Sequence, residues 1–73
     1  MKARPSIERL AFIARRLRRG SAINANSVVK RFEVSRKTAA RDIEFLRDRL
    51  RYELEWVPSQ RTYRLLRAPE AIL

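Results

Sequence analysis

Apolar residues recur at helical spacing over the first two thirds of the chain. In the segment 6–19 they fall within one arc when each residue turns by about 100°; they are Ile7, Leu10, Ala11, Ile13, Ala14 and Leu17. Pro5 and Ser6 stand at the start of this segment, and Gly20, the single glycine of the chain, follows its end. Because a residue in the left-handed region commonly ends a helix, the pattern predicts a helix over residues 6–19.

Phe12 does not fit this arc and points away from the predicted core side. Glu8, Arg9, Arg15 and Arg16 lie outside the arc as well. Two interpretations of Phe12 stay open: a partly exposed ring covered by a flexible tail, or a contact with a dimer partner or another domain.

A short second helix is predicted over residues 24–32. Asn24 is its expected N-cap, and Ile23 precedes it as an apolar anchor. The residues of this helix that should point inward are Val28, Val29 and Phe32.

The third helix follows almost at once. Only Glu33 and Val34 precede Ser35, the expected N-cap of a helix that runs to about Arg49 or Arg51. Its buried stripe consists of Ala39, Ile43, Leu46 and Leu50. Two helices joined by so short a turn cross at a steep angle, which is the helix-turn-helix arrangement.

After Tyr52 the apolar pattern changes from helical to alternating. Two short runs have apolar residues at every second position, namely Leu54, Trp56, Tyr63 and Leu65, around the polar segment 58–62. This predicts a β-hairpin that packs on the helices by its apolar side, with Glu53, Glu55 and Arg64 outside. A base-stacking surface is the alternative role of Trp56 and Tyr63, although their alternation with leucines favours packing in the core.

Together these elements predict an α+β fold, a winged helix-turn-helix in which a three-helix bundle is followed by a C-terminal β-hairpin wing. We expect residues 1–67 to form this domain. Residues 68–73 have no clear pattern and resemble the start of a linker. No apolar run is long enough to cross a bilayer, and no signal-peptide pattern opens the chain, so we expect an intracellular protein without a membrane partner.

The composition points to an anionic partner rather than to catalysis. The chain of 73 residues has 18 Lys or Arg against 8 Asp or Glu, a net charge of +10. Residues 1–34 carry nine basic residues against two acidic ones, residues 35–52 six against three, and the rest three against three. Cysteine and histidine are missing, which removes the usual general base, nucleophile and zinc ligands. We therefore expect no enzyme, no metal and no cofactor, but attraction to anionic polymers and surfaces.

The third helix carries its charges in an unusual order. Its first turns hold Arg36, Lys37 and Arg41, and Glu44 and Asp48 come later, although the helix macrodipole favours acids first and bases last. A polyanion facing this end explains the order, because the cations then add to the attraction of a helix N-terminus for phosphate. The alternative is an ordinary solvated face on which Arg41 pairs with Glu44.

The predicted DNA-contacting residues lie on the third helix, just before it and on the wing. Contacts from the helix, with Arg or Lys reading guanine edges, are expected from Arg36, Lys37, Thr38, Ala40 and Arg41. Contacts to the backbone are expected from Lys30, Arg31, Ser35 and Arg61. The small Ala40 lets the helix sit deep or touches a thymine methyl. Asp42, at the edge of the buried stripe, is expected to pair within the protein instead.

These residues resemble a known family. The stretch VSRKTAARDIEFLRDRL, with VVKRFE before it and YELEWVPSQRTYRL after it, is similar to the N-terminal winged-helix domain of DeoR-type and WYL-domain bacterial transcriptional regulators, over residues 7–66. Two positions depart from the family: Glu33 stands in the turn where Gly is frequent, so a left-handed backbone there is mildly strained, and the wing tip lacks Gly. The resemblance implies a sequence-specific regulator of the bacterial cytoplasm, usually dimeric, with an effector-sensing C-terminal domain.

The predicted function is sequence-specific binding of double-stranded DNA, with residues 35–50 in the major groove and the wing on the adjacent backbone or minor groove. The main alternative is a protein-interaction winged helix that turns its basic face to an acidic partner. The charge also leaves open a cationic peptide on membrane surfaces and an RNA-binding domain.

Overall fold

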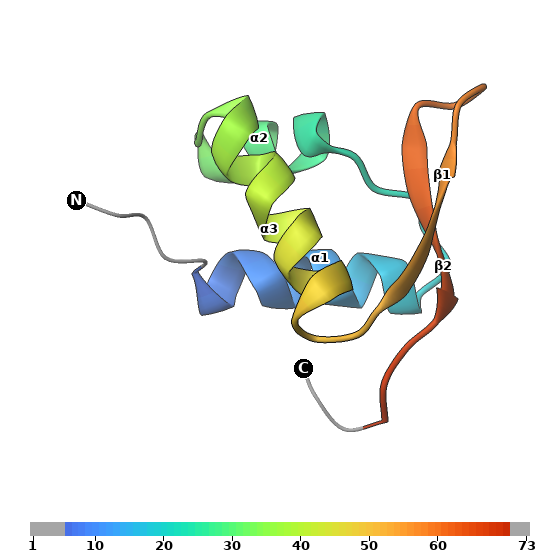
Figure 1. Cartoon of the computed structure of the whole chain (residues 1–73). Coiled ribbons are helices and arrows are strands. Elements are labelled where there is room, and N and C mark those ends of the chain that lie inside the picture. The colour runs from blue at the N-terminus through green and yellow to red at the C-terminus, as the bar shows by residue number, and fades with distance from the viewer. Residues whose placement is uncertain (1–5, 71–73) are drawn as a thin grey trace.

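Three helices precede a two-stranded antiparallel hairpin in the structure, a computed structural model that describes residues 6–70. The elements are α1 (Ile7–Arg18), α2 (Ala25–Phe32), α3 (Arg36–Asp48), β1 (Glu53–Val57) and β2 (Thr62–Arg67) (Figure 1). The predicted α+β fold of the winged-helix type is therefore confirmed. Pro5, which was predicted to help start the first helix, lies outside the described residues. The last residues of the predicted linker also lie outside them.

The helix ends follow from short polar side chains and one glycine. Each helix begins after a side chain whose oxygen accepts a hydrogen bond from the backbone N–H three residues later; these caps are Ser6, Asn24 and Ser35. After α1 the chain turns at Gly20, whose φ of 84° lies in the left-handed region, where glycine carries no Cβ penalty. The predicted helix boundaries are confirmed to within two residues or so at each end.

The core lies between the three helices and the base of the hairpin. Its buried apolar members are Leu10, Ile13, Ala14, Leu17, Ile23, Val28, Ala39, Ile43, Leu46 and Tyr52. The prediction that Ile7 faces the core is wrong, because this first residue of α1 is 75% exposed. Tyr52 was not predicted to be buried, yet it is 1% exposed and the guanidinium of Arg18 lies over its ring.

Phe12 packs against α2. Its ring is half-buried and meets that of Phe32 edge-on, with 5.4 Å between the centroids. The guanidinium groups of Arg16 and Arg31 lie over the Phe12 ring, 5.7 and 5.9 Å from its centroid. The side chain thus belongs to the α1–α2 contact, and the prediction that it points away from the core side is wrong. The flexible tail that was predicted to cover this ring falls outside the described residues.

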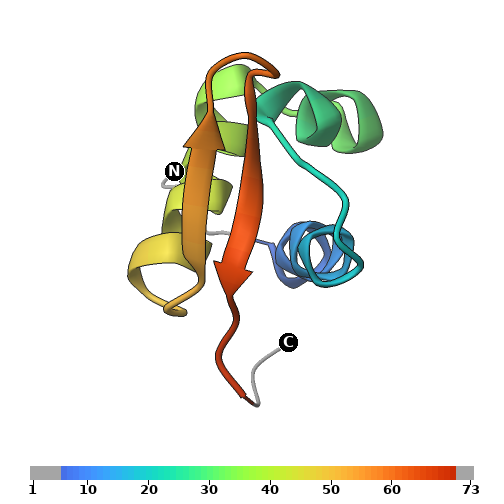
Figure 2. The ribbon, with the colours of Figure 1, turned by 90° about the vertical axis from the view of Figure 1, so that its right-hand side faces the viewer.

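The hairpin stands beside the helices, with its loop at the end of the molecule where α2 and the first turn of α3 lie (Figures 1 and 2). A β-bulge between Glu53 and Leu54 shifts the pairing at the base. Tyr63 of β2 exchanges two backbone hydrogen bonds with Ile23 of the α1–α2 connection, at 3.1 and 2.7 Å. The α1–α2 connection thereby forms an isolated antiparallel bridge with β2, and this bridge fixes the hairpin to the helices.

The turn between α2 and α3 depends on one strained residue. Glu33 has φ 56° and ψ 44°, and its N–H donates to the carbonyl of Val29 at 2.8 Å. The left-handed backbone that the family resemblance implied at this position is therefore present. An L-residue in this conformation costs about 1–2 kcal/mol, and glycine avoids most of that cost.

Glu33→Gly is accordingly expected to raise the free energy of unfolding by about 0.5–1 kcal/mol. This value is the strain that glycine relieves minus the cost of the larger backbone entropy that glycine has in the unfolded chain. Urea unfolding followed by circular dichroism measures the change. Glu33→Ala is the control, because it removes the same charge but keeps the Cβ. Equal stabilisation by both variants would assign the effect to charge instead of backbone strain.

Candidate nucleic-acid interface

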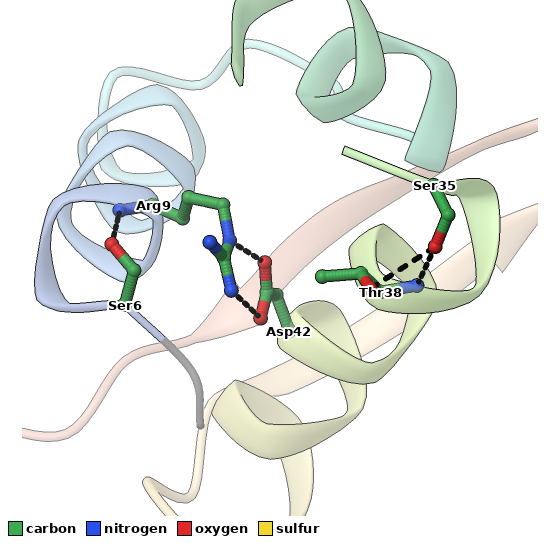
Figure 3. A network of polar contacts seen from close by, with 5 residues as sticks. All are labelled: Ser6, Arg9, Ser35, Thr38 and Asp42. Carbon is green, nitrogen blue, oxygen red and sulfur yellow. Dashed lines mark hydrogen bonds and ion pairs between the residues drawn. The ribbon is translucent and has the colours of Figure 1, made fainter. Parts of the chain in front are cut away.

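A buried ion pair sets how α3 lies on α1. Arg9 of α1 reaches Asp42 of α3 with two hydrogen bonds, from Nε to Oδ2 at 2.5 Å and from Nη2 to Oδ1 at 3.3 Å (Figure 3). The Asp42 residue is 1% exposed. The prediction that Asp42 pairs within the protein is confirmed, and the partner comes from the other long helix. Because this side of α3 is held inward, the opposite side faces solvent.

The first turn of α3 is fixed by its cap. The Ser35 hydroxyl accepts from the backbone N–H of Thr38 and donates to the Thr38 hydroxyl, both at 3.0 Å (Figure 3). The helix N-terminus carries partial positive charge from its free N–H groups. Arg36 and Lys37 are exposed beside it. The result is a concentration of positive charge that is well suited to an anionic group.

The cations of this face are not neutralised by the protein. Arg36, Lys37 and Arg41 are exposed, and among residues 6–70 their side chains form no ion pair or hydrogen bond. In particular, the pair of Arg41 with Glu44, which would make this an ordinary solvated face, is not formed. The cationic side chains therefore remain available to a ligand.

The last turn of α3 is different. Arg47 donates two hydrogen bonds to the Asp48 carboxylate, at 2.8 and 3.1 Å. These bonds lower the pKa of Asp48 below its ordinary value and raise the pKa of Arg47. The charges at the end of α3 thus compensate each other, while those at its beginning do not.

An open groove runs between α3 and the hairpin. Its volume is about 630 Å³. The lining side chains come from the start of α2, from α3 and from the hairpin: Asn24, Ala25, Asn26, Arg36, Ala40, Ile43, Glu44, Trp56, Gln60, Arg61 and Tyr63. Arg36 of α3 and Arg61 of the wing therefore meet the same groove from opposite elements. Ala40 is half-buried in this groove. Its small side chain leaves room for a ligand to come close to the axis of α3.

The wing loop is held in place by the cap of α2. The Asn24 side chain accepts from the N–H and hydroxyl of Ser27 through Oδ1, at 3.0 and 3.2 Å, and donates from Nδ2 to the Arg61 carbonyl at 3.1 Å. Arg61 itself has φ 54° and an exposed side chain. One asparagine thus positions both the helix start and the loop that carries the wing cation.

The prediction that Trp56 packs in the core is wrong. It is 46% exposed, and its ring meets Tyr63 edge-on with 4.9 Å between centroids. Tyr63 does pack against the core, as do Leu54 and Leu65. Trp56 lies on the predicted apolar side of the hairpin, together with Leu54, Tyr63 and Leu65. At Trp56, however, this side borders the groove instead of the core. Whether the ring stacks on bases is a separate question that stays a prediction.

The two predicted contacts on α2 differ in their surroundings. Lys30 and Arg31 are both exposed. The Arg31 guanidinium lies over the Phe32 ring at 5.0 Å and near the Phe12 ring, which holds it against the α1–α2 contact. Lys30 has no such contact among the described residues.

Several groove residues were not predicted from the sequence. Asn24 was assigned only a capping role, and Asn26 and Gln60 carry no signal that separates them from ordinary surface residues. Glu44 was expected on the exposed face of the third helix, as a partner of Arg41 in the alternative interpretation, but not as a DNA contact. Within residues 6–70 no three acidic side chains gather as a metal site would require, and no helix of that range is long and apolar enough to span a bilayer.

The chain was compared with protein-family models, with curated proteins and with solved structures, and none of these comparisons gave a match. Functional inference therefore rests on the architecture and on the residues of the interface.

Proposed function

We propose that this domain binds double-stranded DNA in a sequence-specific manner, as the DNA-binding part of a transcriptional regulator. In this proposal α3 enters the major groove and the hairpin wing lies on the adjacent backbone or minor groove. The resemblance to DeoR-type and WYL-domain regulators belongs to the same proposal. It carries the expectations of a homodimeric full-length protein, a C-terminal effector domain and a location in the bacterial cytoplasm.

The observation that supports the proposal best is the set of unpaired cations at the start of α3. Like charges gathered at a positive helix end cost stability in the free protein. An anionic ligand removes that cost and adds the electrostatic gain of releasing counterions from DNA. Arg61 supports the same inference, because a cation on the wing meets the groove that α3 borders.

Selection of bound duplexes from a random pool, followed by electrophoretic mobility shifts, tests the proposal. The expected result is enrichment of a defined sequence, whose symmetry and half-site spacing then report how many copies bind. Absence of any duplex binding at low salt would favour a protein-interaction domain with an acidic partner. Competition with A-form RNA separates DNA from RNA recognition.

Arg41→Ala is expected to weaken binding to the selected duplex by about 1–3 kcal/mol and to relax the preference at one base pair, because a bidentate arginine contact to guanine is lost. Affinities for the selected duplex and for its single-base variants measure both effects. Arg15→Ala is the control, since it removes the same charge from the exposed side of α1. An equal loss on every sequence would make Arg41 a phosphate contact only.

A further inference from the structure

The solvent-facing side of α3 carries four charged residues in one row. Lys37, Arg41, Glu44 and Asp48 follow each other at spacings of four, three and four, which places them within one narrow strip of a helix. At 1.5 Å per residue the strip is about 16 Å long. Its first half is cationic and its second half is anionic, so acids occupy part of the face that the proposed function turns toward DNA.

The two acids of this row are not equivalent. Asp48 accepts two hydrogen bonds from Arg47, which compensates its charge. Glu44 is exposed and borders the groove beside Arg36 and Ala40. Between residues 6 and 70 its carboxylate has no hydrogen bond or ion pair. Glu44 therefore has no direct hydrogen-bond or ion-pair partner and is attracted by the charge of Arg47 from farther away. It lies next to the cations that are proposed to bind a polyanion.

Such a carboxylate weakens DNA binding unless it meets a hydrogen-bond donor. An ionised carboxylate only accepts hydrogen bonds, and phosphates, guanine O6 and N7, and thymine O4 are also acceptors. In the major groove donors are found on adenine N6 and cytosine N4. The adenine amino group stands beside N7, an acceptor of the same base, which suits an amide side chain. The cytosine ring has no acceptor of its own in the major groove, and its N4 suits Glu or Asp.

We infer that Glu44 is a specificity-determining residue that accepts a hydrogen bond from N4 of a cytosine in the major groove, an inference that rests on the proposed DNA-binding function. Arg41 and Glu44 are three residues apart, which is about 4.5 Å along the helix axis. One base-pair step is about 3.4 Å. The cytosine therefore lies within one or two base pairs of the pair that Arg41 reads.

The experiment compares the wild-type protein with Glu44→Gln on the selected duplex and on all its single-base variants. The wild type is expected to prefer cytosine at one position by roughly 5- to 150-fold, the discrimination of one good base contact. Glu44→Gln is expected to move the preference at that position to adenine, since glutamine pairs with adenine N6 and N7. Asp48→Asn, which alters the compensated acid of the same row, is expected to leave every preference unchanged.

The outcomes separate this inference from the proposed function. Specific binding by the wild type, with Glu44→Gln binding all duplexes more tightly by one common factor, would make Glu44 a repulsive surface charge and overturn the inference alone. A wild-type protein that binds no duplex would overturn both. Glu44→Ala serves as a second variant, and it is expected to lose the cytosine preference without gaining one for adenine.

Discussion

Raising the salt concentration from 50 to 200 mM is expected to lower the affinity for duplex DNA by about 10³–10⁵-fold, if two bound copies together neutralise about 6–10 phosphates. The reason is that each phosphate contact releases condensed counterions, and this release loses its free-energy gain as salt rises. The exposed cations of α3 and the wing cation Arg61 supply such contacts in the proposed complex. Fluorescence anisotropy of a labelled duplex over a series of salt concentrations measures the slope.

The slope also identifies the residues involved. Lys37→Ala is expected to reduce its magnitude by about one for each bound copy, because one phosphate contact per copy disappears. Arg15→Ala changes the net charge by the same amount on α1 and is expected to leave the slope nearly unchanged. An affinity that stays constant between 50 and 200 mM salt would contradict a binding mode based on phosphate contacts.

Asp42→Ala is expected to lower the free energy of unfolding by about 3–5 kcal/mol, because it removes the buried carboxylate that pairs with the half-buried Arg9 guanidinium. A chain of 73 residues has a total stability of only about 4–11 kcal/mol. The variant is therefore expected to be partly unfolded at 37 °C. Urea unfolding followed by circular dichroism measures the loss at lower temperature.

Two further variants show whether the loss of the Arg9–Asp42 ion pair is responsible. Asp48→Ala removes an exposed carboxylate from the same helix and is expected to change stability only slightly. The double variant Arg9→Met with Asp42→Leu removes both charges and keeps the apolar volume, so it is expected to be more stable than Asp42→Ala. If the double variant is no more stable than Asp42→Ala, the stability lost in Asp42→Ala is due to packing.

The parts of the fold that depend on local patterns could be predicted from the sequence. The helix stripes and the caps at Asn24 and Ser35 involve residues within four positions of each other, so periodicity and side-chain chemistry suffice. The errors arise where an element extends past its neighbours. Ile7 and Trp56 have the correct spacing for the core, yet Ile7 is the first residue of α1 and Trp56 the last but one of β1, and both stay largely exposed.

The candidate site was predictable to the extent that its residues lie on one element. The cations of α3 follow from its stripe, because a residue opposite Ala39 and Ile43 is exposed. The contact of Arg9 with Asp42 joins residues 33 positions apart, and the one between Asn24 and Arg61 joins residues 37 apart. No local sequence rule relates residues so far apart. The ion pair and the position of the wing therefore become visible only in the packed structure.

The place of Trp56 has a practical consequence. It is the single tryptophan of the chain, and its half-exposed indole borders the groove that Arg36, Glu44 and Arg61 share. Its emission therefore reports from a wall of the groove, without any attached dye and with no second indole to mask the signal. A titration can follow occupancy of the groove by this intrinsic fluorescence, while far-ultraviolet dichroism follows the helices independently.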